Sequence, residues 1–201
     1  MPSSKAKTTL LTFSRLLLIT GLLVLGGCVT APAPTYQPSV TNTETLMKQA
    51  KTPIGVAAFT AATGVDDTKL IIRGSTLKGG SDGKFSTYLH DATVTELKTA
   101  GRWNPDAGLQ ISATLEQNHL DGGAIKTGSA DIKAHFVITK DGQKVYDKSL
   151  SVQHQWDSSF IGAIAIPTAM QNYVTTVQLL LGKFFSDSDF ISATQSTGSS
   201  N

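Results

Sequence analysis

Two long segments of this sequence alternate apolar and polar residues one by one, and this alternation constrains the fold more than any other feature. In residues 109–118 (LQISATLEQN) every second side chain is apolar as far as Leu115, and residues 129–139 (SADIKAHFVIT) repeat the pattern. A period of two is typical of a β-strand with one buried face and one exposed face. We therefore expect two strands of a sheet that is covered on one side.

The connection after the second of these segments determines how a third strand pairs. A two-residue Asp-Gly turn would place the apolar residues of the next strand on the exposed face, since a shift of one residue exchanges the faces. A three-residue loop over 140–142, with its glycine in the left-handed conformation, corrects this and places Leu150 opposite Ile132. We therefore predict this loop, followed by a strand over about 144–155.

Less regular segments supply the remaining strands. Residues 53–60 (PIGVAAFT) form a short apolar run that begins with a proline, and residues 69–76 (KLIIRGST) combine β-branched residues with a glycine. Both compositions are typical of short strands, so we predict one strand in each segment.

Two further segments have the three- and four-residue spacing of a helix with one apolar face. The first spans about 83–100 and ends before Gly101, where a left-handed residue suits a helix terminus. Ser81 or Asp82 is expected to cap its start. The second helix begins near Pro167, a residue suited to the first turn. The first stripe consists of Phe85, Tyr88, Leu89, Ala92, Glu96 and Leu97, of which only the glutamate is polar. The second consists of Met170, Tyr173, Val174, Val177, Leu180, Leu181 and Phe184.

These elements predict an α+β fold over residues 46–190, with a mostly antiparallel four- to five-stranded sheet and two helices packed on one face. The flanking segments are poor in large apolar residues. Residues 28–45 contain three prolines and residues 191–201 are small and polar. We therefore predict a flexible tether before the domain and a flexible tail after it.

The first 27 residues have the three parts of an export signal. Three basic residues and no acidic residue precede an apolar run at 16–25, which is shorter than the roughly 20 residues needed to span a bilayer. Small residues then precede Cys28, as in a lipoprotein cleavage site. We predict cleavage between Gly27 and Cys28, followed by lipid attachment to the cysteine.

Cys28 is the only cysteine in the chain, so an intramolecular disulfide is excluded. An ordinary signal peptide followed by an incidental cysteine is the alternative, but it leaves this lone thiol unexplained. Two or more acyl chains on one cysteine anchor a protein stably to a membrane. Val29 replaces the aspartate that commonly retains lipoproteins in the inner membrane, which favours an outer-membrane anchor with the domain facing the periplasm.

Removal of the signal changes the charge balance of the protein. The whole chain has 17 basic and 15 acidic residues, and the signal takes away Lys5, Lys7 and Arg15, which leaves 14 basic residues. A nearly neutral mature chain does not have the positive field of a nucleic-acid-binding protein. The GGSDG stretch at 79–83 does not have the lysine of a phosphate-binding loop, so no nucleotide site is predicted.

Three segments of the domain resemble the YajG-type family of small Gram-negative outer-membrane lipoproteins. They are GLQISATLEQNHL at 108–120, ADIKAHFVITKDGQKVYDKSLSV at 130–152 and FIGAIAIPTAMQNYVTTVQ at 160–178. The resemblance consists of apolar and turn patterns. It implies an outer-membrane lipoprotein with a helix-on-sheet domain, and it implies no catalytic residues.

The four histidines do not have the spacing of a metal site. They are His90, His119, His135 and His154, and no two are separated as in HxH or HxxxH. His135, opposite Asp147 in the expected register, could be a base with its orienting carboxylate or a cross-strand polar pair. The polar pair is favoured, and we predict no enzyme activity, metal or cofactor.

The segment 157–166 (DSSFIGAIAI) is apolar without the alternation of a strand. It could be an exposed interaction surface, with Phe160, Ile161 and Ile164 as candidate contacts. It could instead lie beneath the last helix and form its first turn, which we favour.

These observations predict a non-enzymatic envelope lipoprotein whose anchored domain binds an envelope protein during cell-envelope assembly or maintenance. The alternative is a lipid- or glycan-binding accessory lipoprotein of an envelope transport system, which requires an apolar groove under residues 157–166. A periplasmic hydrolase would require histidine, serine and aspartate side chains to converge in the fold.

Overall fold

The computed structural model describes residues 30–123 and 126–195 of the 201-residue chain. The export signal and the cleavage site at Gly27 and Cys28 lie outside the described residues. The strands are β1 (Thr30–Pro32), β2 (Gly55–Val56), β3 (Thr60–Ala61), β4 (Leu70–Ile72), β5 (Ser75–Lys78), β6 (Leu109–Asp121), β7 (Thr127–Lys140) and β8 (Gln143–Asp157). The helices are α2 (Val40–Met47), α3 (Phe85–Thr99), α4 (Gly162–Phe185) and α5 (Ser188–Thr194).

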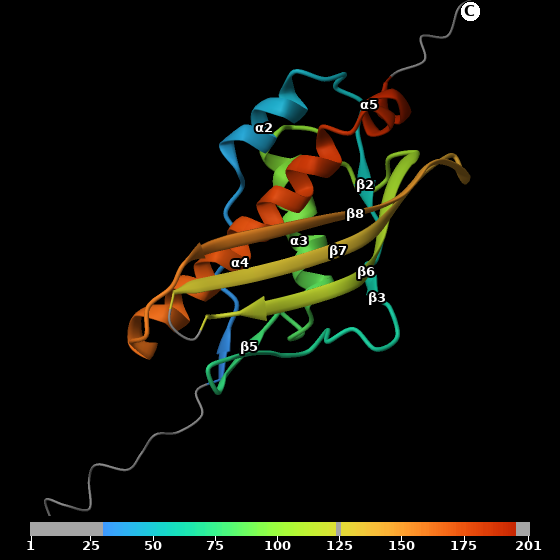
Figure 1. Ribbon diagram of the computed structural model, residues 1–201. Coiled ribbons are helices and arrows are strands. Elements are labelled where there is room, and N and C mark those ends of the chain that lie inside the picture. The colour runs from blue at the N-terminus through green and yellow to red at the C-terminus, as the bar shows by residue number, and fades with distance from the viewer. Residues whose placement is uncertain (1–29, 124–125, 196–201) are drawn as a thin grey trace, which may run out of the picture.

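The strands form two sheets. In the larger sheet, β6, β7 and β8 make an antiparallel meander, and β2 and β3 both pair parallel to β6. In the smaller sheet, β5 lies between β1, which is parallel to it, and β4, which is antiparallel. Helices α3 and α4 lie on one face of the meander (Figure 1), and α2 packs against both of them.

The α+β class is confirmed, but the expected single, mostly antiparallel sheet with two helices is wrong. Both sheets are mixed, and the described residues contain four helices. The parallel strands β1, β2 and β3 have only two or three residues each, which is too short to leave a period in the sequence. The single strand expected over 53–60 is accordingly divided into β2 and β3.

The turn between β7 and β8 differs from the prediction. The three-residue loop expected over 140–142 is a two-residue turn, because Lys140 pairs with Gln143. Both turn residues, Asp141 and Gly142, have positive φ angles, of 50° and 82°. Such angles are typical of a type I′ hairpin turn.

A bulge in β8 then restores the predicted faces. Val145 is an additional residue between two consecutive pairings, which shifts the register by one position. Leu150 is therefore buried as predicted, but it pairs with Ala134 and not with Ile132. The faces were predicted correctly, and the partners were wrong by two residues.

Residues 69–76 form a hairpin and not the single strand predicted there. Strands β4 and β5 are antiparallel on either side of Arg73 and Gly74, whose φ angles are 49° and 82°. This is again a two-residue turn with two positive φ angles, and Ile72 pairs with Ser75 across it.

Helix α3 confirms the first predicted helix but takes its cap from a distant residue. Its N-cap residue, Lys84, makes no side-chain capping bond, and neither Ser81 nor Asp82 occupies that position. Instead, the carboxylate of Asp67 accepts hydrogen bonds from the amide (2.7 Å) and the hydroxyl (2.9 Å) of Ser86. A carboxylate in this place satisfies amides that the helix leaves without partners.

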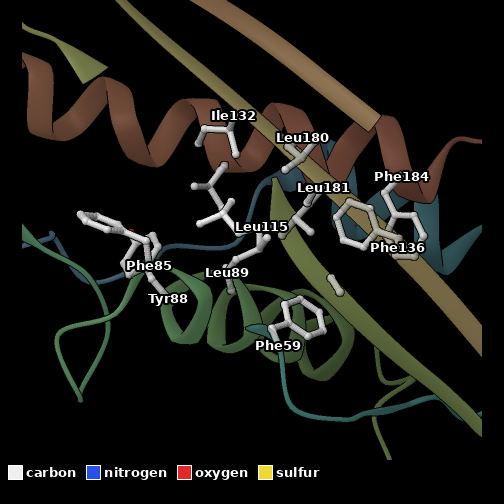
Figure 2. Close-up of a cluster of buried hydrophobic side chains, with 14 of the residues drawn as sticks. Phe59, Phe85, Tyr88, Leu89, Leu115, Ile132, Phe136, Leu180, Leu181 and Phe184 are labelled. Atoms are coloured by element: carbon white, nitrogen blue, oxygen red, sulfur yellow. The ribbon is translucent and has the colours of Figure 1, made fainter. Parts of the chain in front are cut away.

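Helix α4 brings the largest group of core side chains onto β7 and β8. Figure 2 shows Leu180, Leu181 and Phe184 of this helix next to Phe136 of β7, with Leu89 of α3 nearby. The rings of Phe136 and Phe184 are stacked, with 4.2 Å between centroids and 12° between planes. Full burial of side chains of this size stabilises a fold by about 1.5–3 kcal/mol each.

The flexible tether and tail are wrong for the residues that the structure describes. Residues 30–45 include β1 and most of α2, and Tyr36 between them is only 8% exposed. At the other end, α5 extends to Thr194, and Phe190 is fully buried. The composition of these two segments gives no sign that they are ordered, because their order depends on contacts with residues far along the chain. The folded domain therefore extends beyond the predicted limits of 46–190.

Candidate functional site

The three candidate interface residues lie together where α4 begins. Phe160 and Ile161 directly precede the helix and Ile164 is in its first turn. Their side chains are 76%, 45% and 53% exposed, respectively. A compact group of large exposed apolar residues often marks an interaction site. We refer to these three residues as the apolar surface.

Helix α4 begins at Gly162, earlier than the start predicted near Pro167. The favoured reading of segment 157–166 is therefore half right: it supplies the first turn of the helix, but its large side chains are not covered. Ala165 is fully buried, so this segment packs on the domain through a small side chain. The apolar surface consequently points away from the core.

Arg73 holds the backbone beneath the apolar surface. From the β4–β5 turn, its Nε donates to the carbonyl of Gly123 (2.8 Å) and its Nη2 to that of Ser159 (2.6 Å). Its Nη1 donates to the carbonyl of Phe160 (2.9 Å). The planar fork of guanidinium donors can join several carbonyl groups in this way. The start of α4 is thereby fixed to the smaller sheet.

The same small sheet receives the N-terminal strand. Strand β1 runs parallel to β5, with Thr30 opposite Thr76 and Pro32 opposite Lys78. The chain therefore enters the domain on the side of the β4–β5 turn. Figure 1 shows β5 and the beginning of α4 at one end of the molecule and α5 at the other.

A buried carboxylate joins the N-terminal segment to the domain. Glu96 of α3 is fully buried, and its Oε1 accepts hydrogen bonds from the Tyr36 hydroxyl (2.6 Å), the Ser39 amide (2.9 Å) and Asn42 Nδ2 (3.1 Å). Burial, and then Glu96 itself, raise the pKa of Tyr36 far above its ordinary 10.0, so the hydroxyl remains a donor. Sequence reasoning missed this centre, although Glu96 was the one polar residue on an apolar stripe.

Arg102 is a second buried polar residue that sequence reasoning missed. It is 2% exposed, and its guanidinium donates to Gln49 Oε1 (3.0 Å) and to the carbonyl of Thr52 (3.3 Å). Burial lowers the pKa of Arg102 to about 10. This residue holds the segment that follows α2.

The histidines are on four different elements. His90 on α3 bonds to Asp91 (2.9 Å), His154 on β8 bonds to Asn172 (2.9 Å), and His119 is exposed on β6. Within the described ranges, no three histidine, aspartate, glutamate or cysteine side chains gather as a metal site would require.

His135 and Asp147 form the predicted polar contact, but along a diagonal. Asp147 pairs with Val137 in the ladder, and its carboxylate bonds to the His135 ring from there. Lys144 Nζ reaches the same carboxylate at 2.5 Å. The Lys144 bond, then the His135 bond, lower the pKa of Asp147. The group is exposed and mutually paired, as expected of a surface cluster.

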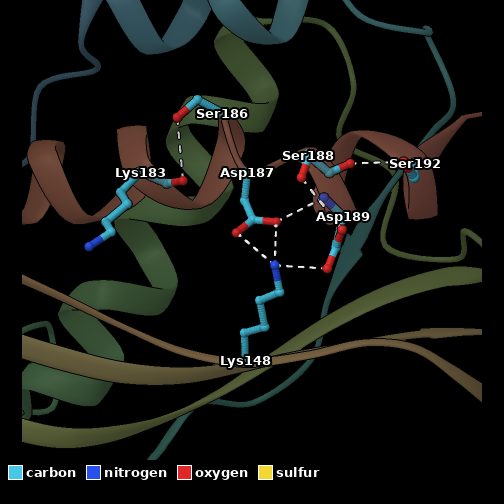
Figure 3. Close-up of polar contacts among 7 residues, drawn as sticks. All are labelled: Lys148, Lys183, Ser186, Asp187, Ser188, Asp189 and Ser192. Carbon is cyan, nitrogen blue, oxygen red and sulfur yellow. Dashed lines mark hydrogen bonds and ion pairs between the residues drawn. The ribbon is translucent and has the colours of Figure 1, made fainter.

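The acidic residues near the C-terminus also have structural partners. Figure 3 shows Lys148 of β8 between Asp187 and Asp189, with Nζ to oxygen distances of 3.0 and 2.8 Å. Asp187 also caps α5 by accepting from the amide of Asp189 (2.8 Å). Lys148 thus fixes α5 to the edge of the larger sheet.

Hollows of 300 to 420 Å³ are present on the described surface. One of 420 Å³ is bounded by β8 and α5, and one of 330 Å³ lies beside residues 32–36. The others are at residues 107–109 (300 Å³) and between α2 and α4 (360 Å³). None of these four is lined by residues 157–166, where the lipid- or glycan-binding alternative requires its groove.

The chain shares its fold with a solved structure of low sequence identity. The protein XCC0632 from Xanthomonas campestris, of the family DUF330, superposes with a TM-score of 0.54 and 14% identity, covering 78% of this chain and 95% of that one. A minor lipoprotein from Acinetobacter baumannii (TM-score 0.37, 10% identity, 68% and 90% covered) is more distant. So is the hypothetical protein CT253 from Chlamydia trachomatis (0.42, 8%, 68% and 99%).

The likeness to the Xanthomonas structure supports the helix-on-sheet fold, and none of these comparisons singles out the YajG-type family. No protein-family model matches the sequence, and no curated protein does. Of the helices that the structure describes, none has the length and apolar character needed to cross a membrane.

Proposed function

We propose that this protein is a non-enzymatic lipoprotein of the cell envelope, attached to the outer membrane through Cys28, with its domain facing the periplasm. The observation that carries the proposal is the position of the apolar surface. It lies at the end of the domain where the chain enters at Thr30, two residues after Cys28. The anchor and an exposed contact surface would then meet the membrane together.

The polar groups of the domain support a binding role. The candidate acid and base side chains are dispersed over separate elements, and His90, His135 and His154 each bond to a different neighbour. Glu96 and Arg102 are occupied in joining the N-terminal segment to the domain. The resemblance to YajG-type lipoproteins agrees with a location in the cell envelope, and we propose an accessory role there in envelope assembly or maintenance.

Lipid labelling tests the anchor. Cells supplied with a labelled fatty acid are expected to label the wild-type protein and not the Cys28→Ser variant, because the thiol is the point of attachment. Separated membranes test its location: Val29→Asp should move the protein to the inner membrane, whereas the matched Val29→Ser variant should stay with the wild type. Equal labelling of wild type and Cys28→Ser would refute the lipoprotein assignment.

The envelope protein partner is proposed to bind the edge of the larger sheet. Strand β8 has 15 residues and ends the strand order of that sheet, and such an edge can accept a strand from another protein. A photo-crosslinker at exposed Gln153 of β8 should capture one specific envelope protein in cells. The same group at exposed Gln117 of the inner strand β6 is the control. Equal background capture at both positions would contradict the partner site and leave the anchor untouched.

A further inference from the structure

We infer that the apolar surface is seated in the lipid bilayer, so that Phe160, Ile161 and Ile164 form a second membrane contact beside the lipid on Cys28. This inference rests on the proposed lipid anchor. It adds the occupant of the apolar surface, which is the membrane interface itself, and an orientation of the domain on that membrane.

The length of the chain before β1 places the bilayer at this end of the domain. Thr30 is the first described residue and is paired with Thr76 in the smaller sheet. Only Val29 separates it from Cys28, and two trans peptide steps extend at most about 7–8 Å between Cα atoms. The lipid-bearing residue therefore cannot lie far from the smaller sheet.

One side chain connects this sheet to the apolar surface. Arg73 occupies the β4–β5 turn, on the side where β1 begins, and donates to the carbonyls of Ser159 and Phe160. Phe160 is thus within the reach of a single arginine side chain from that turn. Ile71 of β4 is also 53% exposed and pairs with Thr76, the residue opposite Thr30. The anchor point and the apolar surface belong to the same end of the molecule.

The chemistry of the segment suits a membrane interface. Residues 158–166 contain no charged side chain, and the first turn of α4 contains no acidic residue. The Ser158 hydroxyl donates to the carbonyl of Gly122 (2.5 Å), and the Ser159 hydroxyl accepts from the amide of Ile161 (3.1 Å). These polar groups already have partners, so entry into the interface leaves them satisfied. Large apolar side chains next to an acyl anchor add to its membrane affinity.

Single-cysteine labelling of the full-length lipidated protein tests the inference. Since lipid occupies Cys28, an Ile161→Cys or Ile164→Cys substitution introduces the one free thiol for an environment-sensitive fluorophore. Leu179→Cys is the matched control, because Leu179 is on the same helix as Ile164 and has the same exposed fraction as Ile161, 45%. It lies 15 residues after Ile164, roughly 22 Å further along α4 at 1.5 Å per residue. Each labelled protein is reconstituted in vesicles of phosphatidylethanolamine and phosphatidylglycerol.

We expect the fluorophore at 161 or 164 to emit at shorter wavelength, to be quenched by lipids with a spin label on the acyl chain, and to be protected from aqueous iodide. The fluorophore at 179 should emit at longer wavelength, should not be quenched by the spin-labelled lipids and should be quenched by aqueous iodide. Circular dichroism of each labelled protein must match the wild type, and all three substituted positions are exposed enough to tolerate the change.

Two outcomes would overturn the inference. One is iodide quenching at 161 and 164 equal to that at 179 in protein that remains bound to the vesicles. The other is protection of 161 and 164 in native membranes but not in protein-free vesicles, which would assign the apolar surface to a protein partner. Failure of the proposed lipid anchor can be distinguished from failure of this inference. If Cys28 carried no lipid, the Cys28→Ser protein and the wild type would float with vesicles to the same extent.

Discussion

The hydroxyl of Tyr36 donates a 2.6 Å hydrogen bond to the carboxylate of Glu96, sixty positions further along the chain. The same oxygen accepts from the Ser39 amide and the Asn42 side chain. A fully buried carboxylate requires such donors, since burial without them is costly. The proline-rich N-terminal segment is for this reason a part of the core.

Tyr36→Phe is expected to lower the free energy of unfolding by about 1.5–3 kcal/mol, the usual range for a hydrogen bond to a charged group. Urea unfolding of the mature protein measures this. Tyr88→Phe is the matched control, because the Tyr88 hydroxyl also holds the N-terminal segment but donates to a neutral carbonyl, that of Pro34 (2.8 Å). Its expected loss is about 0.5–1.5 kcal/mol. A loss for Tyr36→Phe no larger than for Tyr88→Phe would argue against the role of the charge.

Phe184→Ala should destabilise the domain by about 3–5 kcal/mol, because it leaves a cavity in the core. Phe184 stacks on Phe136 and meets Phe190 at 4.7 Å between ring centroids. Phe160→Ala removes the same side chain from a 76% exposed position and should change stability by no more than about 0.5 kcal/mol. Thermal and urea unfolding give both values. A large loss for Phe160→Ala would mean that the apolar surface is structural.

Gly142→Ala and Gly162→Ala are expected to act in opposite directions. Gly142 has a φ of 82° and open space around it, so an added methyl group costs only the left-handed backbone penalty of about 1–2 kcal/mol. Gly162 is in the first turn of α4, and an added Cβ makes only an ordinary 4.0 Å contact with Ile166. That substitution should stabilise by about 0.4–1 kcal/mol. Changes of the same sign would contradict the assigned turn.

Lys148→Met should flatten the pH dependence of stability at both extremes. Burial alone would raise the pKa of Asp187, but the hydrogen bonds from Lys148 and the backbone lower it. A lowered carboxyl pKa contributes stability that is fully present at pH values above the ordinary pKa of 3.8. This stability is lost as the pH falls through the lowered pKa. The hydrogen bonds to Asp189, and then to Asp187, raise the pKa of Lys148. Its contribution to stability is therefore complete below pH 10.5 and is lost as the pH rises through the raised pKa.

Thermal unfolding across the pH range measures this difference between wild type and Lys148→Met. Lys48→Met is the control, since it removes an exposed pair between the C-cap residue of α2 and Glu44 (3.5 Å). Exposed pairs of this kind contribute little. Parallel pH profiles for wild type and Lys148→Met would show that this ion-pair cluster does not stabilise the fold.

The meander and the two longest helices could be predicted because each leaves a local period in the sequence. The short parallel strands could not, since their partners on β5 and β6 lie far along the chain. The burial of Asn118 was also unpredictable: a register shift between Leu115 and Gln117 turns it inward, where it accepts a hydrogen bond from Tyr173 (2.9 Å). A bulge changes which residues face the core without a clear signal in composition.

The apolar surface was only half predictable. The run without alternation identified Phe160, Ile161 and Ile164, but their exposure depends on Ala165 facing the core. Arg73, which fixes this segment by hydrogen bonds, lies 87 positions before Phe160, and no spacing rule connects the two residues. Likewise, Asp67 caps α3 from 19 positions before Ser86.

The immediate start of β1 at Thr30 also determines how far this protein can reach. Without a spacer, a lipid on Cys28 would hold the domain at a working height set by its own dimensions, of which the 24-residue α4 accounts for about 36 Å. Partners would have to come to the membrane surface to be met. Inserting a Gly-Ser spacer before Thr30 would extend that height without altering any surface of the domain, and would separate the effect of distance from the effect of contact.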